Sequence, residues 1–201
     1  MPVRSLFATP FYDNQIGDAA LLAELAASCR MLAEEDRAGR AWSKAKGYRG
    51  YTSYASLNDL PQRDPAFADL KRLLDREAKL FARAVHFDLA RAPKLDSLWV
   101  NVMKPGATHS GHIHPHSIIS GTFYVAVPPG SGALKLEDPR LPMLMAAPLR
   151  SEEAPPEVQP FFYAEPAAGT VFLWESWLRH EVMPHEGKGE RISVSFNYRP
   201  G

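Results

Sequence analysis

The apolar residues near the start of the chain recur at the spacing of an amphipathic helix. From Asp18 to about Arg37, leucines and Cys29 repeat every three or four residues, which places them on one helix face. Asp18 is suited to cap the first turn and Gly39 to end the helix. Cys29, the single cysteine, is predicted to be a small buried hydrophobe rather than a catalytic thiol.

A second helical pattern covers residues 65–91. Its apolar stripe is longer and contains Phe67, Leu70, Leu73, Leu74, Ala78, Leu80, Phe81 and Val85. The connector between the two helices, residues 42–60, is rich in Gly, Tyr and Ser and predicts no particular element. We therefore expect residues 1–94 to form a mainly helical scaffold.

The pattern changes at Leu95, where short segments rich in β-branched and aromatic residues alternate with Pro and Gly turns. Each has the length of a strand: LWVNVM, SGTFYVAV, GALKLE, TVFLW and RISVSFNYR. Such a series is typical of an antiparallel sandwich or barrel. We predict an α+β fold in which an all-β core, residues 95–201, forms a jelly roll, or double-stranded β-helix barrel, with flanking N-terminal helices.

The length of 201 residues fits a single domain with one substantial core. Residues 141–166 are rich in proline and predict one long irregular insertion. Such an insertion either covers a binding mouth as a lid or runs passively over the surface.

Charge and hydropathy exclude several classes of partner. Lys and Arg total 23, as do Asp and Glu, so the net charge of zero offers no electrostatic basis for binding nucleic acid or an anionic membrane. No apolar run approaches the roughly 18–20 residues of a membrane span. The first residues also lack the apolar stretch of a secretion signal. The expectation is a soluble, cytoplasmic protein.

Four of the seven histidines, at positions 109, 112, 114 and 116, lie in the string THSGHIHPHS. On an extended strand, residues two apart share a face at about 7 Å, so two imidazoles can bind one metal ion. Either His112 and His114 or His114 and His116 could form this pair, and we favour the former. His180, in a later strand-like segment, is the expected third ligand. Three imidazoles suit iron, zinc, copper or nickel and leave positions open for catalysis.

The last predicted strand, RISVSFNYR, alternates polar and apolar residues. One face carries Arg191, Ser193, Ser195 and Asn197, and the other carries Ile192, Val194 and Phe196. A guanidinium with a hydroxyl two residues further on can hold a carboxylate. Arg191 follows His180 by about one hairpin, so a ligand that chelates the metal could present a carboxylate to Arg191 and Ser193.

These motifs resemble the iron(II)/2-oxoglutarate-dependent oxygenases. The segments HIHPHSIISGTFYV, FLWESWLRHEVMP and ERISVSFN are similar to one family whose pattern reads H-x-H-P, S-G-x-x-Y-V, W-L-x-H-x-V-x-P and R-x-S-x-S-F-N. The opening LFATPFY is similar to that family's start. The specific motifs lie between Asn101 and Asn197.

The resemblance implies an oxygenase, more narrowly a hydroxylase, that uses Fe(II), 2-oxoglutarate and O2. His112 and His180 match the first and last iron ligands, and Arg191 and Ser193 match the pair that binds the distal carboxylate of 2-oxoglutarate. Tyr124 matches a tyrosine that hydrogen-bonds this carboxylate in several relatives. If the predicted alternation of side chains along each strand is right, three further polar residues share the cavity: Asn101, Ser120 and Asn197.

One position departs from the wider superfamily. A carboxylate usually stands two residues after the first histidine, where this chain has His114. A neutral ligand in place of an anion raises the charge of the metal centre by one and changes its affinity for an anionic co-substrate. Glu137, Asp138 and Glu175 are candidates to supply a carboxylate from another strand.

Three alternatives use the same residues. A cupin-type metal protein, or a three-histidine dioxygenase or isomerase that does not use 2-oxoglutarate, fits Gly106 followed by His-x-His, but the cupin glutamate is absent from PHSIISG. A zinc hydrolase fits three imidazoles but leaves Arg191 and Ser193 without a role. The third alternative is a non-enzymatic binding module.

The metal motif does not specify the substrate, because loops and the cavity mouth determine it in such folds. A small molecule, a free amino acid and a protein side chain are all compatible with the sequence. A homodimer through the helical layer is the ordinary expectation.

Overall fold

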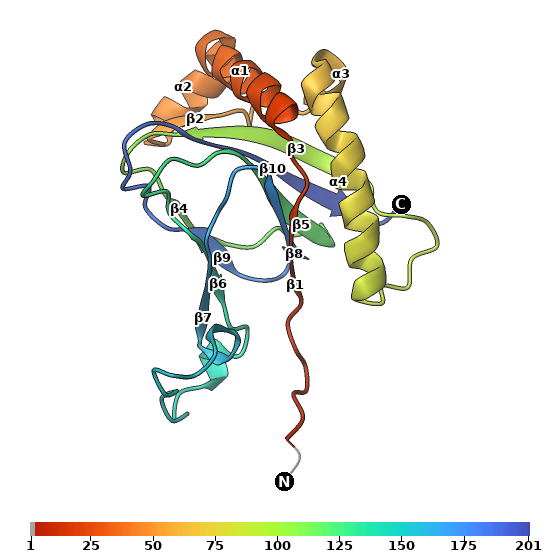
Figure 1. Cartoon of the computed structure of the whole chain (residues 1–201), viewed down its shortest axis with the longest axis vertical. Helices are drawn as coiled ribbons and strands as arrows, with labels where there is room; N and C mark the ends of the chain where they lie inside the picture. Colours follow the sequence, from red (N-terminus) through yellow and green to blue (C-terminus); the bar gives the residue numbers. More distant parts are fainter. Residues whose placement is uncertain (1–2) are drawn as a thin grey trace.

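Two antiparallel sheets face each other in the computed structural model, which describes residues 3–201 (Figure 1). The six-stranded sheet has the order β1-β8-β5-β10-β3-β2, and the four-stranded sheet has the order β4-β9-β6-β7. The strands are β1 (Phe11–Gln15), β2 (Gly50–Thr52), β3 (Lys94–Met103), β4 (His109–His112), β5 (Ile119–Ala126), β6 (Leu134–Glu137), β7 (Phe161–Ala164), β8 (Thr170–Glu175), β9 (His180–Val182) and β10 (Arg191–Arg199).

From β3 onward the chain crosses repeatedly between the two sheets. Strands β3, β5, β8 and β10 lie in the large sheet, and β4, β6, β7 and β9 lie in the small one. This alternation is the jelly-roll topology, so the predicted fold class is confirmed. Strands β1 and β2 extend the two edges of the large sheet.

Four helices precede the jelly roll: α1 (Ala19–Glu35), α2 (Arg37–Ala45), α3 (Leu60–Arg63) and α4 (Pro65–Ala84). They cover the outer face of the large sheet (Figure 1). Their buried side chains, among them Leu25, Phe67 and Leu74, share one core with Val100 of β3 and Val194 of β10. A second apolar cluster lies between the sheets and includes Met103, Tyr124, Leu136, Phe172, Trp174 and Val182.

The first helix ends earlier than the sequence pattern predicts. It stops at Glu35, and Gly39 lies inside the next helix, α2, so the prediction that Gly39 ends the helix was wrong. The break is fixed at Asp36, whose carboxylate caps the N–H of Gly39 (2.9 Å) and accepts hydrogen bonds from the hydroxyls of Tyr51 (2.9 Å) and Ser56 (2.5 Å). A Cβ at Gly39 would overlap with this cluster, so the glycine serves close packing there.

Other boundaries also differ from the expectation. Helix α4 ends at Ala84 rather than near residue 91, and His86 adopts a positive φ of 57° just after it. The connector 42–60 contains the end of α2 and strand β2. Residues 141–166 are not wholly irregular, because they contain β7, which pairs with β6.

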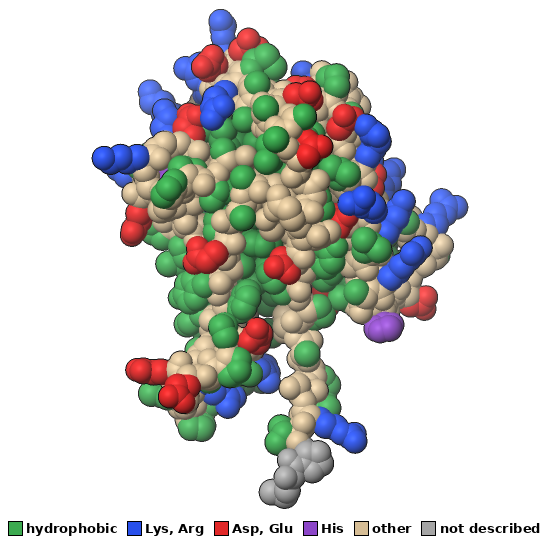
Figure 2. Space-filling view, viewed as in Figure 1, with side chains coloured by type: hydrophobic (Ala, Val, Ile, Leu, Met, Phe, Trp, Pro, Cys, Tyr) green, Lys and Arg blue, Asp and Glu red, His purple; other side chains and the backbone are tan. Residues whose placement is uncertain are grey.

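The surface view agrees with the neutral net charge. Acidic and basic side chains are interspersed over the visible face, and the β6–β7 connection and the N-terminal segment project from the body (Figure 2). Within residues 3–201, no helix combines the length and hydrophobicity that crossing a membrane requires.

Candidate metal centre and its cavity

A cavity of about 1100 Å³ opens between the two sheets. One wall is the polar face of β10, with Arg191, Ser193, Ser195 and Asn197, as the alternation of the sequence predicts. The apolar residues between them belong to the core under the helices. The opposite wall carries the histidine-bearing ends of β4 and β9.

Three imidazoles gather in this cavity. His112, at the end of β4, is paired in register with His180, at the start of β9. His114 lies in the loop after β4, where its backbone N–H donates to the carbonyl of Ser176 (3.1 Å). One ligand nitrogen from each of the three histidines lies within 4.8 Å of the others. The favoured histidines thus meet, although they do not share one continuous strand as the spacing argument assumed.

The other two histidines of the cluster point elsewhere. His116 is exposed and has a positive φ of 70°. His109 lies against the ring of Tyr48, and its Nε2 is 2.9 Å from the Tyr48 hydroxyl. Both lie outside the three-histidine group.

Backbone carbonyls determine which ring nitrogen is free on two of the three histidines. Nδ1 of His112 lies 2.7 Å from the carbonyl of Ser110, and Nδ1 of His180 lies 2.8 Å from that of Leu178. A carbonyl can only accept, so in the neutral ring each Nδ1 carries the proton and each Nε2 keeps its lone pair. This is the tautomer that coordinates a metal through Nε2.

Burial keeps two of these rings neutral. Burial is the larger cause and the neighbouring His112 the smaller, and together they lower the pKa of His180 to about 3 and the pKa of His114 to about 4. Neutral imidazole is the form that binds metals. The donor set therefore suits a metal ion near neutral pH.

The three-histidine group contains no carboxylate among residues 3–201. The three candidate carboxylates are bonded to other groups. Glu137 pairs with Arg179 (3.3 Å), Asp138 with Arg140 (2.8 Å), and Glu175 accepts from the indole of Trp177 (2.8 Å). The group could therefore bind a divalent cation only through imidazole nitrogens, which as neutral donors would not offset its charge.

The deep part of the cavity contains the buried guanidinium of Arg191, which forms no ion pair with the described residues 3–201. Arg191 is 1% exposed, its guanidinium lies 5.0 Å from the ring centroid of Tyr124, and Nη1 donates to the sulfur of Met103 (3.2 Å). Its Nε and the hydroxyl of Tyr124 are buried without a hydrogen-bond partner, and no carboxylate in residues 3–201 pairs with it. An unpaired buried charge is costly. The site therefore fits an anionic ligand, as the carboxylate of 2-oxoglutarate would be.

Two further predicted residues lie beside Arg191 in the sheet. Ser193 pairs in register with Asn101 on one side and Tyr124 on the other. Asn101 donates to the hydroxyl of Ser195 (3.1 Å). Both Ser193 and Asn101 line the cavity, whereas Ser120 binds Ser176 and Asn197 beneath its wall.

One wall of the cavity comes from the connector 42–60 and was not predicted from the sequence. Trp42, Tyr48 and Tyr54 line it. Ring centroids are 6.2 Å apart for Trp42 and Tyr54 and 5.2 Å apart for Tyr54 and Trp99, and Trp99 lies 5.9 Å from His114. The aromatic content of the connector was the available signal. Residues 141–166 contribute nothing to the lining, so the structure does not support a lid there.

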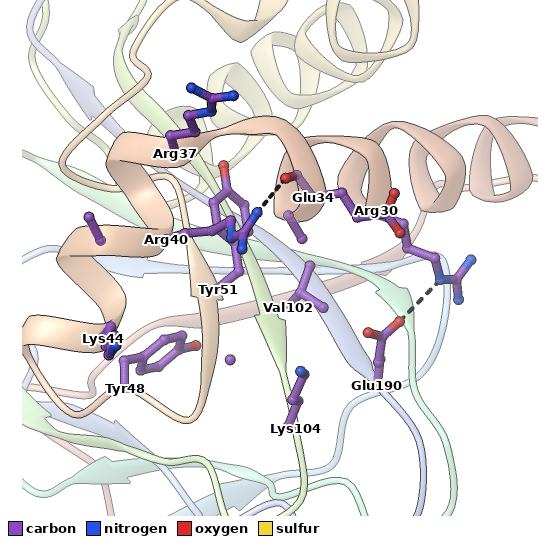
Figure 3. Close-up of a pocket in the computed structure, with 13 residues that line it drawn as sticks. Arg30, Glu34, Arg37, Arg40, Lys44, Tyr48, Tyr51, Val102, Lys104 and Glu190 are labelled. Atoms are coloured by element: carbon purple, nitrogen blue, oxygen red, sulfur yellow. Dashed lines mark hydrogen bonds and ion pairs between the residues drawn. The ribbon is translucent and has the colours of Figure 1, made fainter.

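A second cavity, of about 950 Å³, lies where α1 and α2 meet β2 and β3 (Figure 3). Its lining includes Arg37, Lys44 and Lys104, together with Arg30 paired to Glu190 at 3.2 Å. Tyr48 lines both cavities. The second cavity contains none of the histidines, so the metal chemistry belongs to the first.

Comparisons with known proteins agree with this geometry. A family model described as "Putative 2OG-Fe(II) oxygenase" matches residues 97–197, about half of the chain. A comparison with curated proteins found no match.

Solved structures share the fold at low sequence identity. A Pseudomonas putida prolyl-4-hydroxylase is 17% identical with a TM-score of 0.63, covering 96% of this chain and 94% of the other. The epimerase SnoN from nogalamycin biosynthesis is 15% identical with a TM-score of 0.64, covering 96% and 77%. A viral collagen prolyl hydroxylase from Paramecium Bursaria Chlorella virus-1 is 13% identical with a TM-score of 0.60, covering 95% and 96%.

These likenesses show a double-stranded β-helix, and the family match lies over the strands that carry the histidines and Arg191. The chain therefore belongs to the 2OG-Fe(II) oxygenase family and is a 2-oxoglutarate- and iron(II)-dependent oxygenase.

Proposed function

We propose that His112, His114 and His180 hold Fe(II) and that Arg191 and Tyr124 hold the distal carboxylate of 2-oxoglutarate. The observation that carries this assignment is that one cavity contains three clustered imidazole nitrogens and a buried guanidinium without an ion pair. When bound, Fe(II) with 2-oxoglutarate and O2 supplies the oxidation of a substrate C–H bond, with succinate and CO2 formed from the co-substrate.

The charges of the protein groups explain why a dianionic co-substrate suits this cavity. Three neutral imidazoles leave the charge of a divalent cation uncompensated, and Arg191 adds a second positive charge. A dicarboxylate placed between the metal and Arg191 would offset both. Charge-assisted hydrogen bonds from the guanidinium, and from the Tyr124 hydroxyl that lacks a partner, would orient it.

Ser193 supports this end of the cavity from β10, next to Tyr124 in the sheet register. Its hydroxyl is a further donor on the face that carries Arg191. The lining of the cavity includes the buried apolar side chains Leu134, Trp174 and Val182. Such a lining excludes water and strengthens the electrostatic contacts inside the cavity.

We further propose that the substrate approaches the metal along the aromatic wall formed by Trp42, Tyr54 and Trp99. These rings lead from the surface, where Tyr54 is 60% exposed, to His114. Aromatic faces favour a substrate with an apolar or ring-bearing portion. The structural neighbours include prolyl hydroxylases and an epimerase from nogalamycin biosynthesis, so protein side chains and small molecules are both substrate classes to screen.

An anaerobic titration tests the assignment. Fe(II) and 2-oxoglutarate should give the visible charge-transfer absorption of a chelated 2-oxoacid in the wild type. The band should disappear in His180→Ala and weaken strongly in Arg191→Ala. Arg199→Ala is the matched control, because Arg199 lies on the same strand with its side chain half exposed and paired to Asp96.

An unchanged band in Arg191→Ala would remove the carboxylate-binding role. The activity itself is tested by admitting oxygen and measuring succinate. If 2-oxoglutarate binds and no succinate forms with any screened substrate or without one, a binding module becomes the better account of the site. Hydrolysis that depends on zinc, with no response to 2-oxoglutarate, would favour the zinc hydrolase.

A further inference from the structure

His114 differs from the other two clustered histidines in what its Nδ1 faces. The Nδ1 atoms of His112 and His180 each meet a backbone carbonyl two residues earlier in the chain. His114 lies in a loop, and the polar group that faces its Nδ1 is the side-chain amide of Asn197, with Nδ2 at 3.5 Å. The third ring is thus oriented by a side chain from a remote strand.

The amide of Asn197 is held by a network of hydroxyls at the cavity wall. Asn197 is 7% exposed; its Oδ1 accepts from Ser120 (2.8 Å), and its Nδ2 donates to Ser97 (3.1 Å). The hydroxyls of Ser120 and Ser176 lie 2.8 Å apart, and both serines are 1% exposed. These contacts fix the plane of the amide.

The proton on His114 decides which end of this amide must face it. Nε2 of His114 lies 3.2 Å from Nε2 of His180, so Nε2 is the nitrogen directed toward the shared metal position. When that nitrogen lends its lone pair to a metal, the proton of the neutral ring is on Nδ1 and needs an acceptor. An NH2 group cannot accept, whereas a carbonyl oxygen can.

A half-turn of the amide about its Cβ–Cγ bond gives each contact of the network one donor and one acceptor. The exchange places Oδ1 toward both Ser97 and His114, where it accepts from the Ser97 hydroxyl and from Nδ1–H. Nδ2 then donates to Ser120, which is free to donate to Ser176. The nitrogen and oxygen of the amide are similar in size, so no other atom has to move.

We propose that Asn197 is a positioning residue whose side-chain carbonyl accepts the Nδ1–H of His114 and so directs Nε2 to the metal. The inference rests on the proposed metal site. For His114, the Asn197 side chain takes the part that a backbone carbonyl takes for His112 and His180. It also gives a role to Asn197 as the last residue of the R-x-S-x-S-F-N motif, which the proposed co-substrate site does not use. Groups of this kind around metal ligands typically change metal affinity by about 10- to 100-fold.

The first test compares Co(II) affinity, measured by titration under anaerobic conditions, in the wild type and two variants. Asn197→Leu removes the acceptor and should weaken Co(II) binding by about 10- to 100-fold. Asn197→Asp keeps an acceptor and should bind at least as tightly as the wild type. Ser195→Ala is the matched control: Ser195 lies on the same wall, bonds Asn101 and Thr122, and should leave Co(II) affinity unchanged.

A second measurement on the wild type remains decisive even if Asn197→Leu folds poorly. In protein labelled with ¹⁵N-histidine and loaded with Zn(II), His114 should show a protonated Nδ1 and a metal-bound Nε2. A metal-bound or unprotonated Nδ1 would overturn the inference, and so would equal Co(II) affinity in Asn197→Leu and the wild type. Failure of the wild type to bind either metal would overturn the proposed function as well, which separates the two outcomes.

Discussion

Replacing Arg191 by methionine should have opposite effects on the protein with and without its co-substrate. Without co-substrate, the wild type carries a buried guanidinium that has no anionic partner. Methionine fills similar space beside Met103 and Tyr124 and removes the desolvated charge. Apolar replacement of buried ionic groups is neutral to stabilising by about 1–4 kcal/mol. The free energy of unfolding should therefore stay the same or rise.

The variant should lose most of the stabilisation that 2-oxoglutarate gives. Truncating one partner of a buried charge pair costs about 2–5 kcal/mol, and 2.8 kcal/mol corresponds to about a 100-fold weaker Kd. At a concentration of about 100 Kd for the wild type, bound ligand adds about 2.7 kcal/mol to its stability and about 0.4 kcal/mol to that of the variant. For a chain of 201 residues, these values correspond to a rise in Tm of roughly 5–10 °C against about 1 °C.

Thermal unfolding of the Co(II)-loaded proteins, with and without 2-oxoglutarate, measures both effects. Arg199→Met, on the same strand but with its side chain half exposed, should behave as the wild type in its response to ligand. An equal rise in Tm for Arg191→Met and the wild type would refute the assignment of Arg191 to the carboxylate. A marked loss of stability without ligand would refute the argument that its charge is unpaired.

Three further predictions concern Tyr124, Glu77 and Cys29. Tyr124→Phe should keep the fold and weaken 2-oxoglutarate binding by roughly 10-fold or more in the charge-transfer titration. The reason is that a hydrogen bond to a charged group contributes about 1.5–3 kcal/mol. Unchanged binding would exclude the hydroxyl as a donor. Burial by itself raises the pKa of Glu77, but hydrogen bonds from Tyr12 and Asn14 outweigh it and the net pKa is lowered. The unfolded state therefore binds more protons in acid, and the stability from Glu77, present above about pH 4.3, is lost as the pH falls through the folded-state pKa. Denaturant titrations should show that the free energy of unfolding falls less between about pH 6 and pH 3 in Glu77→Gln than in the wild type. An equal fall in both proteins would contradict this reasoning. Burial raises the pKa of the Cys29 thiol, so a thiol reagent should modify Cys29 only at the rate of unfolding. Fast labelling of the native protein would contradict this, because it would show that the reagent reaches Cys29 in the folded state.

Local patterns in the sequence determined much of the fold. The spacing of Leu25 and Cys29 predicted the buried face of α1, because a helix brings every third or fourth residue to one side. The alternation in β10 predicted that Arg191 and Asn197 share a face, because successive side chains of a strand point to opposite sides. Both predictions depend on neighbours in the chain alone.

Element ends and short edge strands required the tertiary structure. Asp36 ends α1 because its carboxylate meets the hydroxyls of Tyr51 and Ser56, which come from beyond the next helix. Strand β7 exists because β6 offers it a pairing edge, although its surroundings are rich in proline. The connector 42–60 became a wall of the cavity because β2 pairs with β3 and carries the neighbouring aromatic residues to that side.

The histidine cluster also shows which features local sequence patterns determine and which require the tertiary structure. The sequence by itself determined that imidazoles two residues apart could share a metal ion, and it favoured the pair before Pro115 without excluding the pair across it. The tertiary structure brings His112 and His114 together with His180, because the pairing of β4 with β9 sets His112 opposite His180, and the network of Asn197 lies beside His114. Side-chain spacing is a local property of the backbone, whereas a ligand set depends on distances between strands that are far apart in the chain, and only packing of the two sheets fixes those distances.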